Sequence, residues 1–152
     1  DVTIYEFFDY NCGYCKSVMQ NIFNIYKKDK KVEIVFVEYP ILSNSSLSAA
    51  IASLAARNQN KYFEFHTKLM KHTGKIDEKL LLSFAEELKI DTKKLKSDYS
   101  NEKLMLIINK NREIANRLNL RGTPAFIIGN KIYPGAMSEK DIEKAIALER
   151  KR

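Results

Sequence analysis

The chain has 152 residues, which is enough for one domain with its own hydrophobic core. Apolar residues make up 45% and charged residues 30%, an ordinary balance for a globular protein. No apolar run approaches the roughly 20 residues that a membrane-spanning helix needs. The net charge is +7, but the basic residues are spread along the chain without an RNA-binding aromatic pattern. We therefore expect no nucleic-acid partner.

The first forty residues or so predict a strand, a helix and a second strand. Residues 2–8 alternate and are rich in β-forming side chains, which indicates a strand. Apolar residues then recur at helical spacing over residues 18–26, and residues 32–39 form a mostly apolar strand that Pro40 ends. So short a connection favours a parallel, right-handed strand–helix–strand unit.

The next eighty or so residues show helical patterns and no convincing strand. Helices are predicted over residues 45–57, 62–70, 78–88 with Asp77 as N-cap, a short segment capped by Asp91, and 104–118. A hairpin follows, with strands at 125–128 and 131–133 joined by Gly129-Asn130. Ser138 and Asp141 resemble a capping box that starts a final helix.

This order of elements places the chain in the α/β class with the arrangement of the thioredoxin fold. We expect one domain over residues 1–152, with a large all-helical insertion over about residues 41–118. Because a fold does not by itself specify a function, the functional argument must come from the side chains of the site.

The two cysteines of the chain form the motif Cys12-Gly13-Tyr14-Cys15. Two cysteines cannot build a framework of structural disulfides, and they cannot hold zinc without further ligands. His66 and His72 are six positions apart, so they do not share one helical face. We favour a redox pair, with half of a zinc site or an accidental pair as the alternatives, and we expect no bound metal.

The place of the motif between a strand and a helix supports redox chemistry. A thiolate rather than a thiol attacks a disulfide. Cys12 stands where a helix begins, so unpaired backbone N–H groups and the positive end of the helix dipole favour its thiolate. We expect Cys12 to be the exposed nucleophile and Cys15, one turn later, to be the buried thiol that resolves the mixed disulfide.

Thr123-Pro124 follows Gly122 just before the third predicted strand. An ordinary strand-initial proline is one interpretation. In a thioredoxin-like fold, however, this proline is cis and faces the cysteine pair, and it leaves nearby backbone free to pair with an extended substrate segment. Together with the cysteine motif and the element order, this second interpretation is the one we favour.

Two segments carry a resemblance to a known family. The segment EFFDYNCGYC, from Glu6 to Cys15, resembles the active-site region of the bacterial DsbA family, and GTPAF, from Gly122 to Phe126, resembles its cis-proline segment. With the helical insertion, the resemblance covers nearly the whole chain and is closest to the ScsC and Com1-like branch. It implies a protein disulfide oxidoreductase or isomerase that needs no cofactor.

The residues around the cysteines differ from those of the typical DsbA oxidase, which has Pro-His between them and Val before the cis-proline. This chain has Gly13-Tyr14 and Thr123, which resemble the disulfide isomerase DsbC. A histidine can stabilise the thiolate by its charge or a hydrogen bond, whereas Tyr14 offers at most a hydroxyl. We therefore expect isomerase-like character and a reduction potential nearer about −180 mV than about −120 mV.

The resemblance also places an acid beneath the resolving cysteine, and Glu6 matches that position. Glu6 is a candidate to shuttle the proton of Cys15. Alternation along the strand does not fix the face that Glu6 occupies, so an outward-pointing carboxylate is the alternative. Glu38, at the end of the second strand, is a weaker candidate.

The resemblance implies cysteine-containing substrate proteins, a membrane redox partner and a periplasmic location, because disulfides persist outside the cytosol. No signal sequence is visible, and we expect one to have been removed. An N-terminal segment assembles ScsC-like relatives, so we expect a monomer here and a homo-oligomer for a longer form that carries such a segment. The alternative functions are a copper-binding or copper-tolerance protein, with Cys12 and Cys15 as soft ligands, and a redox-inert structural domain.

Overall fold

The computed structural model describes residues 1–152 and contains one four-stranded sheet. Its strands are β1 (Val2–Phe8), β2 (Val32–Glu38), β3 (Ala125–Ile128) and β4 (Lys131–Pro134), in the order β2-β1-β3-β4. β1 runs parallel to β2 and antiparallel to β3, and β3 and β4 form a hairpin. The α/β thioredoxin fold and the parallel strand–helix–strand unit predicted from the sequence are confirmed.

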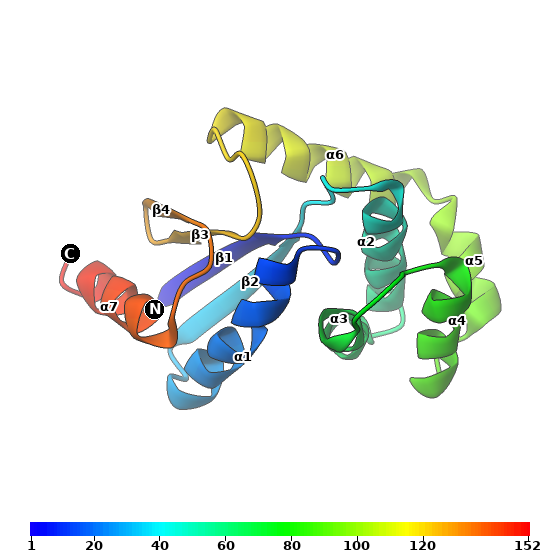
Figure 1. Ribbon diagram of the computed structural model, residues 1–152, viewed down its shortest axis with the longest axis horizontal. Coiled ribbons are helices and arrows are strands. Elements are labelled where there is room, and N and C mark those ends of the chain that lie inside the picture. The colour runs from blue at the N-terminus through cyan, green and yellow to red at the C-terminus, as the bar shows by residue number, and fades with distance from the viewer.

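Two helices cover one face of the sheet, another reaches the opposite face, and the rest stand beside the sheet (Figure 1). They are α1 (Gly13–Lys28), α2 (Asn44–Arg57), α3 (Tyr62–Lys71), α4 (Glu78–Glu87), α5 (Thr92–Tyr99), α6 (Glu102–Arg117) and α7 (Glu139–Arg150). α1 and α7 pack together on the sheet, α2 to α5 form a block beside it, and α6 leads back toward β3. The helices between β2 and β3 are therefore one inserted unit.

Polar side chains fix where most of the helices begin. Asp77, Asp91 and Ser138 accept hydrogen bonds from backbone N–H groups in the first turns of α4, α5 and α7, as the sequence predicts. α6 begins two residues earlier than predicted because Asn101 also caps a helix, accepting from the N–H of Lys103. The hairpin turn holds Gly129 at φ +61°, a backbone conformation that favours glycine.

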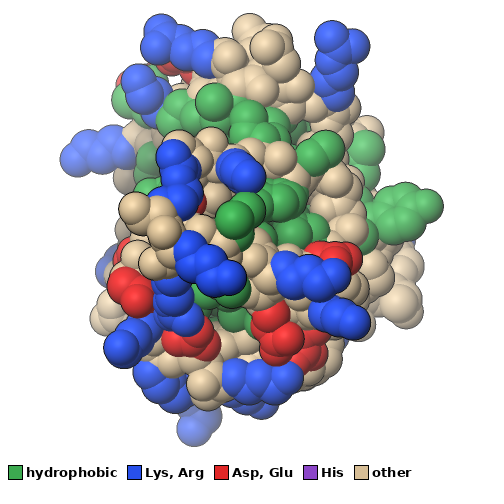
Figure 2. Space-filling view, turned by 90° about the vertical axis from the view of Figure 1, so that its left-hand side faces the viewer, with side chains coloured by type: hydrophobic (Ala, Val, Ile, Leu, Met, Phe, Trp, Pro, Cys, Tyr) green, Lys and Arg blue, Asp and Glu red, His purple; other side chains and the backbone are tan.

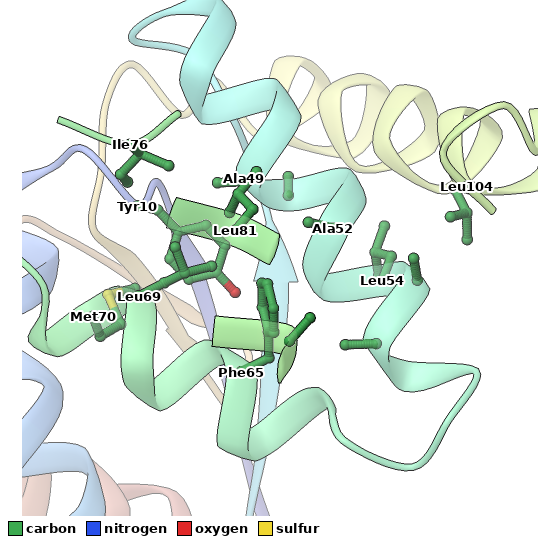
Figure 3. Packing of buried hydrophobic residues seen from close by; sticks show 14 of the residues in the cluster. Tyr10, Ala49, Ala52, Leu54, Phe65, Leu69, Met70, Ile76, Leu81 and Leu104 are labelled. Carbon is green, nitrogen blue, oxygen red and sulfur yellow. The ribbon is translucent and has the colours of Figure 1, made fainter. Parts of the chain in front are cut away.

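The apolar interior has two main parts. One cluster of 12 buried residues, around Ile4, Ile22 and Ile142, lies between the sheet and helices α1 and α7. A larger cluster of 20, the insertion core, includes Phe65 and Leu69 and fills the helical block. Figure 3 shows Tyr10 reaching into the insertion core among side chains of α2, α3 and α4. The segment that follows β1 is thus packed into the insertion as well as into the sheet.

Charged side chains are dispersed over the face of the molecule that Figure 2 shows. On the face in Figure 2, Lys and Arg side chains are scattered around an apolar middle, with Asp and Glu among them. At the end of α7, Arg150 holds the carboxylates of both Asp1 and Asp29 at 2.7–3.2 Å. None of the helices combines the length and hydropathy that crossing a membrane would need.

Two phenylalanines on α3 test the assignment of its faces. Phe65 is fully buried in the insertion core, whereas Phe63, two positions earlier, is 51% exposed. We expect Phe65→Ala to lower the free energy of unfolding by about 3–5 kcal/mol, because it removes a buried ring and leaves a cavity. Phe63→Ala should cost about 1 kcal/mol or less, because its ring is already half in water. Urea unfolding of both variants measures the contrast, and equal losses would contradict this packing.

Candidate active site

The cysteine motif joins the end of β1 to the start of α1. Cys12 is the N-cap residue of α1, with an extended backbone, and its Sγ accepts a hydrogen bond from the N–H of Cys15 at 3.3 Å. The sulfur therefore takes the place of the usual capping oxygen, at the positive end of a 16-residue helix. An anion at this position is stabilised by groups that the backbone supplies.

Thr123 and Pro124 lie against the same sulfur. The thiol of Cys12 donates to the carbonyl oxygen of Thr123 at 3.3 Å, and the Thr123–Pro124 peptide bond is cis. Both cysteines are free thiols. Cys12 is only 7% exposed, which differs from the exposed nucleophile predicted, because the segment with Thr123 covers part of it. Most of the surface of Cys12 is therefore covered.

Cys15 lies in the first turn of α1 with no exposed surface, in contact with the insertion core. Burial raises the pKa of the Cys15 thiol, and its hydrogen bond with Cys12 raises it further. The two sulfurs therefore lie in different environments. The sulfur of Cys12 caps α1, whereas the thiol of Cys15 keeps its proton in the interior.

The two residues between the cysteines supply no side-chain hydrogen bond to either sulfur. Tyr14 is 72% exposed, and its hydroxyl makes no hydrogen bond in the structure. Open space surrounds the position where Gly13 would carry a Cβ. Because neither side chain supports the sulfur of Cys12, stabilisation of its thiolate depends on the backbone geometry of the cap.

Glu6 lies on the face of β1 that carries Ile4 and that α1 covers, so it points inward. Burial raises the pKa of Glu6 to about 8. The carboxyl is consequently protonated at neutral pH and can accept or release a proton slightly above it. The outward-pointing alternative left open by the sequence is wrong.

Glu38 belongs to a buried polar network that the sequence did not reveal. Its Oε1 accepts from the hydroxyls of Tyr10 at 2.7 Å and Tyr62 at 2.8 Å, and the Tyr10 hydroxyl lies 2.9 Å from Nδ1 of His66. Burial raises the pKa of Glu38 to about 8 and lowers that of His66 to about 3. His66 is therefore a neutral core residue. Nowhere do three or more His, Cys, Asp or Glu side chains gather as a metal site would require.

Asp9 is the residue near the site that sequence reasoning missed. Its carboxylate is buried and accepts four hydrogen bonds: from Asn11 N–H and Ser46 Oγ at 2.7 Å each, from Ile41 N–H at 2.9 Å and from Leu42 N–H at 3.0 Å. The available signal was an acidic residue between an apolar strand and the cysteine motif, together with the serine-rich start of α2.

A family model described as Thioredoxin matches residues 1–147. The structure superposes with a TM-score of 0.97 on a thioredoxin-like oxidoreductase from Silicibacter pomeroyi DSS-3, with 38% identity over 100% of this chain and 88% of that one. The thiol-disulfide exchange protein alpha-DsbA2 from Wolbachia pipientis gives a TM-score of 0.91 and 30% identity over 97% of this chain and 81% of that one. The catalytic domain of Proteus mirabilis ScsC shares the fold, with a TM-score of 0.89 and 23% identity over 100% of this chain and 85% of that one.

Curated relatives differ in length. A probable disulfide bond formation protein D from Bacillus cereus is 29% identical over 99% of this chain and 75% of its own length. The chain is also 23% identical, over 95% of its length, to Na(+)/H(+) antiporter NhaA 1 from Salinispora arenicola, of which it spans only 22%. The Bacillus cereus relative and the Wolbachia pipientis structure confirm the resemblance to the DsbA family.

The protonation of Glu6 can be tested through stability. A carboxyl whose pKa rises from about 4.5 to about 8 on folding favours the fold fully at acid pH and loses that contribution as pH rises through this window. Glu6→Gln cannot titrate. Its stability relative to the parent should therefore increase by about 2 kcal/mol between pH 5.5 and 7.5. Urea midpoints at several pH values measure this difference. The pH dependence of stability that comes from Glu38 and His66 is the same in both proteins and cancels. A constant difference would mean that Glu6 is ionised in the folded protein.

Proposed function

We propose a function from one premise: this chain belongs to the thioredoxin family, in its DsbA-like group. The proposed function is thiol–disulfide exchange with cysteine-containing proteins in the periplasm, with isomerase character. The observation that carries the proposal is the position of the Cys12 sulfur, which caps α1 and lies 3.3 Å from the carbonyl of Thr123 beside Pro124. An extended substrate segment that pairs with this backbone would bring its own sulfur to Cys12.

In the reducing direction, the thiolate of Cys12 attacks one sulfur of a substrate disulfide. A bond forms between the two sulfurs, and the other substrate sulfur leaves with the electron pair as a thiolate. Cys15 then loses its proton and attacks Cys12 Sγ, which closes the Cys12–Cys15 disulfide and releases the first substrate sulfur as a thiolate. The oxidising direction is the reverse, and isomerisation uses the first step and its reversal on another pair of substrate cysteines.

Cys15 must give up a proton in the interior, where water is scarce. Burial holds the pKa of the Cys15 thiol high, so its deprotonation needs an acceptor nearby. Glu6 lies on the face of β1 beneath α1. Its raised pKa of about 8 leaves a minor ionised fraction at neutral pH, and this carboxylate can accept the proton of Cys15. We assign Glu6 the role of proton shuttle for the resolving step.

The absence of a side chain that stabilises the Cys12 thiolate in the first turn of α1 supports isomerase character. No charged or hydrogen-bonding side chain from residue 13 or 14 reaches the Cys12 sulfur, because Tyr14 extends into solvent. Less stabilisation of the thiolate makes the disulfide a weaker oxidant. The likeness to DsbA-type relatives and the need for an oxidising compartment support a periplasmic location.

Exchange activity is tested with paired assays on the parent and two cysteine variants. Oxidation of a reduced model protein and refolding of a scrambled one should both be lost in Cys12→Ser. Cys15→Ser should instead accumulate a mixed disulfide with substrate, because it can form the first bond but not resolve it. If Cys12→Ser kept either activity, the proposed function would fail. Stoichiometric Cu(I) binding by a protein that exchanges no disulfides would favour the copper-binding alternative.

The direction of exchange is tested by the reduction potential. Equilibration of the Cys12–Cys15 pair with glutathione buffers should give a value nearer about −180 mV than the about −120 mV of a strong oxidant. Tyr14→His offers a matched comparison, because a histidine in the first turn can stabilise the thiolate. This variant should be more oxidising than the parent. A parent value close to −120 mV would contradict the isomerase assignment.

A further inference from the structure

The buried carboxylate of Asp9 joins the active-site segment to the helical insertion. We propose that Asp9, Asn11 and Ser46 form a clamp that positions Cys12, so that the reactivity of this thiol depends on how the insertion is docked. The proposal rests on the proposed function, in which Cys12 is the attacking thiol. In this proposal, Asp9 and Ser46 are positioning residues that act through the backbone next to Cys12.

The hydrogen bonds of Asp9 come from three separate places in the chain. Asn11 N–H belongs to the turn before Cys12, Ile41 and Leu42 N–H to the connection after β2, and Ser46 Oγ to the first turn of α2. Each carboxylate oxygen accepts two of these bonds. A buried carboxylate is costly unless donors surround it. All three segments must therefore be in place together for Asp9 to be accommodated.

Asn11 makes the second part of the clamp. The two hydrogens of its side-chain amide are shared among the hydroxyls of Ser43, Ser45 and Ser46, which lie 3.2, 2.9 and 2.8 Å from the amide nitrogen. The Ser46 hydroxyl, which has no exposed surface, accepts from Asn11 and donates to Asp9 at 2.7 Å. One hydroxyl of the insertion thus holds both residues of the turn.

Between these two residues, Tyr10 is also anchored in the insertion. Its ring lies in the insertion core (Figure 3), and its hydroxyl donates to Glu38 at 2.7 Å. Three consecutive side chains of the turn before Cys12 are therefore fixed by the helical insertion and the end of β2. The position of the turn is therefore tied to both of them.

The turn formed by residues 9–11 determines the geometry with which Cys12 caps α1. The N–H of Cys12 donates to the backbone carbonyl of Asp9 at 3.1 Å. This bond and the clamp set the direction from which Cys12 enters α1. With Tyr14 in solvent, the cap bond from Cys15 N–H is the local support for the thiolate. A loosened clamp should therefore make the thiolate less favourable.

If Asp9 acted through its charge alone, its removal would have the opposite effect on the Cys12 thiolate. A negative charge near a forming thiolate opposes it, so removing that charge would favour the thiolate. The titratable groups that interact with Asp9 are Lys16, whose half-buried ammonium it attracts, and Glu38, which burial keeps mainly protonated at neutral pH. Because the two roles predict opposite changes, the direction of the effect distinguishes them.

The decisive variant is Ser46→Ala, which removes one hydroxyl from the clamp and changes no charge. It is made in the Cys15→Ser protein, where Cys12 is the only thiol, and the rate of Cys12 alkylation by iodoacetamide is followed against pH. We expect the rate at pH 7 to fall about threefold, the size of one helix-terminus interaction. The profile should shift to higher pH with an unchanged rate at its alkaline plateau.

Ser48→Ala is the matched control. Ser48 lies on the same helix but is exposed, and its hydroxyl donates to the carbonyl of Asn44 rather than to the turn. We expect its profile to coincide with that of the parent. An equal shift in Ser48→Ala would show that any loosening of α2 has the same effect, and it would overturn the clamp.

Asp9→Asn provides a second, stronger perturbation, because it removes both the charge and part of the accepting capacity. We expect a slower reaction at pH 7 than in Ser46→Ala, measured on samples that circular dichroism shows to be folded. A faster reaction would mean that Asp9 acts through its charge, and unchanged profiles in both variants would mean a purely structural role. Either result refutes the clamp while leaving Cys12-dependent exchange intact, so it is distinct from failure of the proposed function.

Discussion

A carboxylate can be buried in a protein only where hydrogen-bond donors surround it, and Asp9 is buried where three parts of this chain meet. Its four partners come from the turn before Cys12, the connection after β2 and the first turn of α2. The thioredoxin sheet and the helical insertion cannot be treated as independent units, since this constraint is satisfied only when they are docked together. The cysteine motif begins at Cys12, three residues after Asp9.

The ionisable groups around the motif are separated by their environments. Cys12 lies at the positive end of α1 near the surface, where an anion is stabilised. Cys15 and Glu6 lie in the interior, where burial raises the pKa of each and keeps the proton bound. One group is thus suited to attack as an anion and the others to hold and pass a proton.

The site combines family features with its own variations. The cis peptide before Pro124 and the sulfur cap of α1 lie within a fold that this chain shares with DsbA-type relatives. The outward-pointing Tyr14 leaves the Cys12 sulfur without side-chain support, so the backbone geometry has the larger influence. Many of the contacts that hold this backbone come from the insertion, which links the helical block to the reacting atom.

The sequence by itself determined the order of elements, several helix caps and the cysteine motif, because periodicity, capping and turn chemistry are local properties of a few neighbouring residues. The cis-proline segment was also found, through its resemblance to a family. Tertiary structure decided the rest. β1 is buried on both faces near its end, so alternation could not place Glu6. The cover that Thr123 gives to Cys12 joins positions 111 residues apart, and the Asp9–Ser46 bond joins positions 37 apart. Contacts between distant segments depend on how whole elements pack, and no local pattern records them.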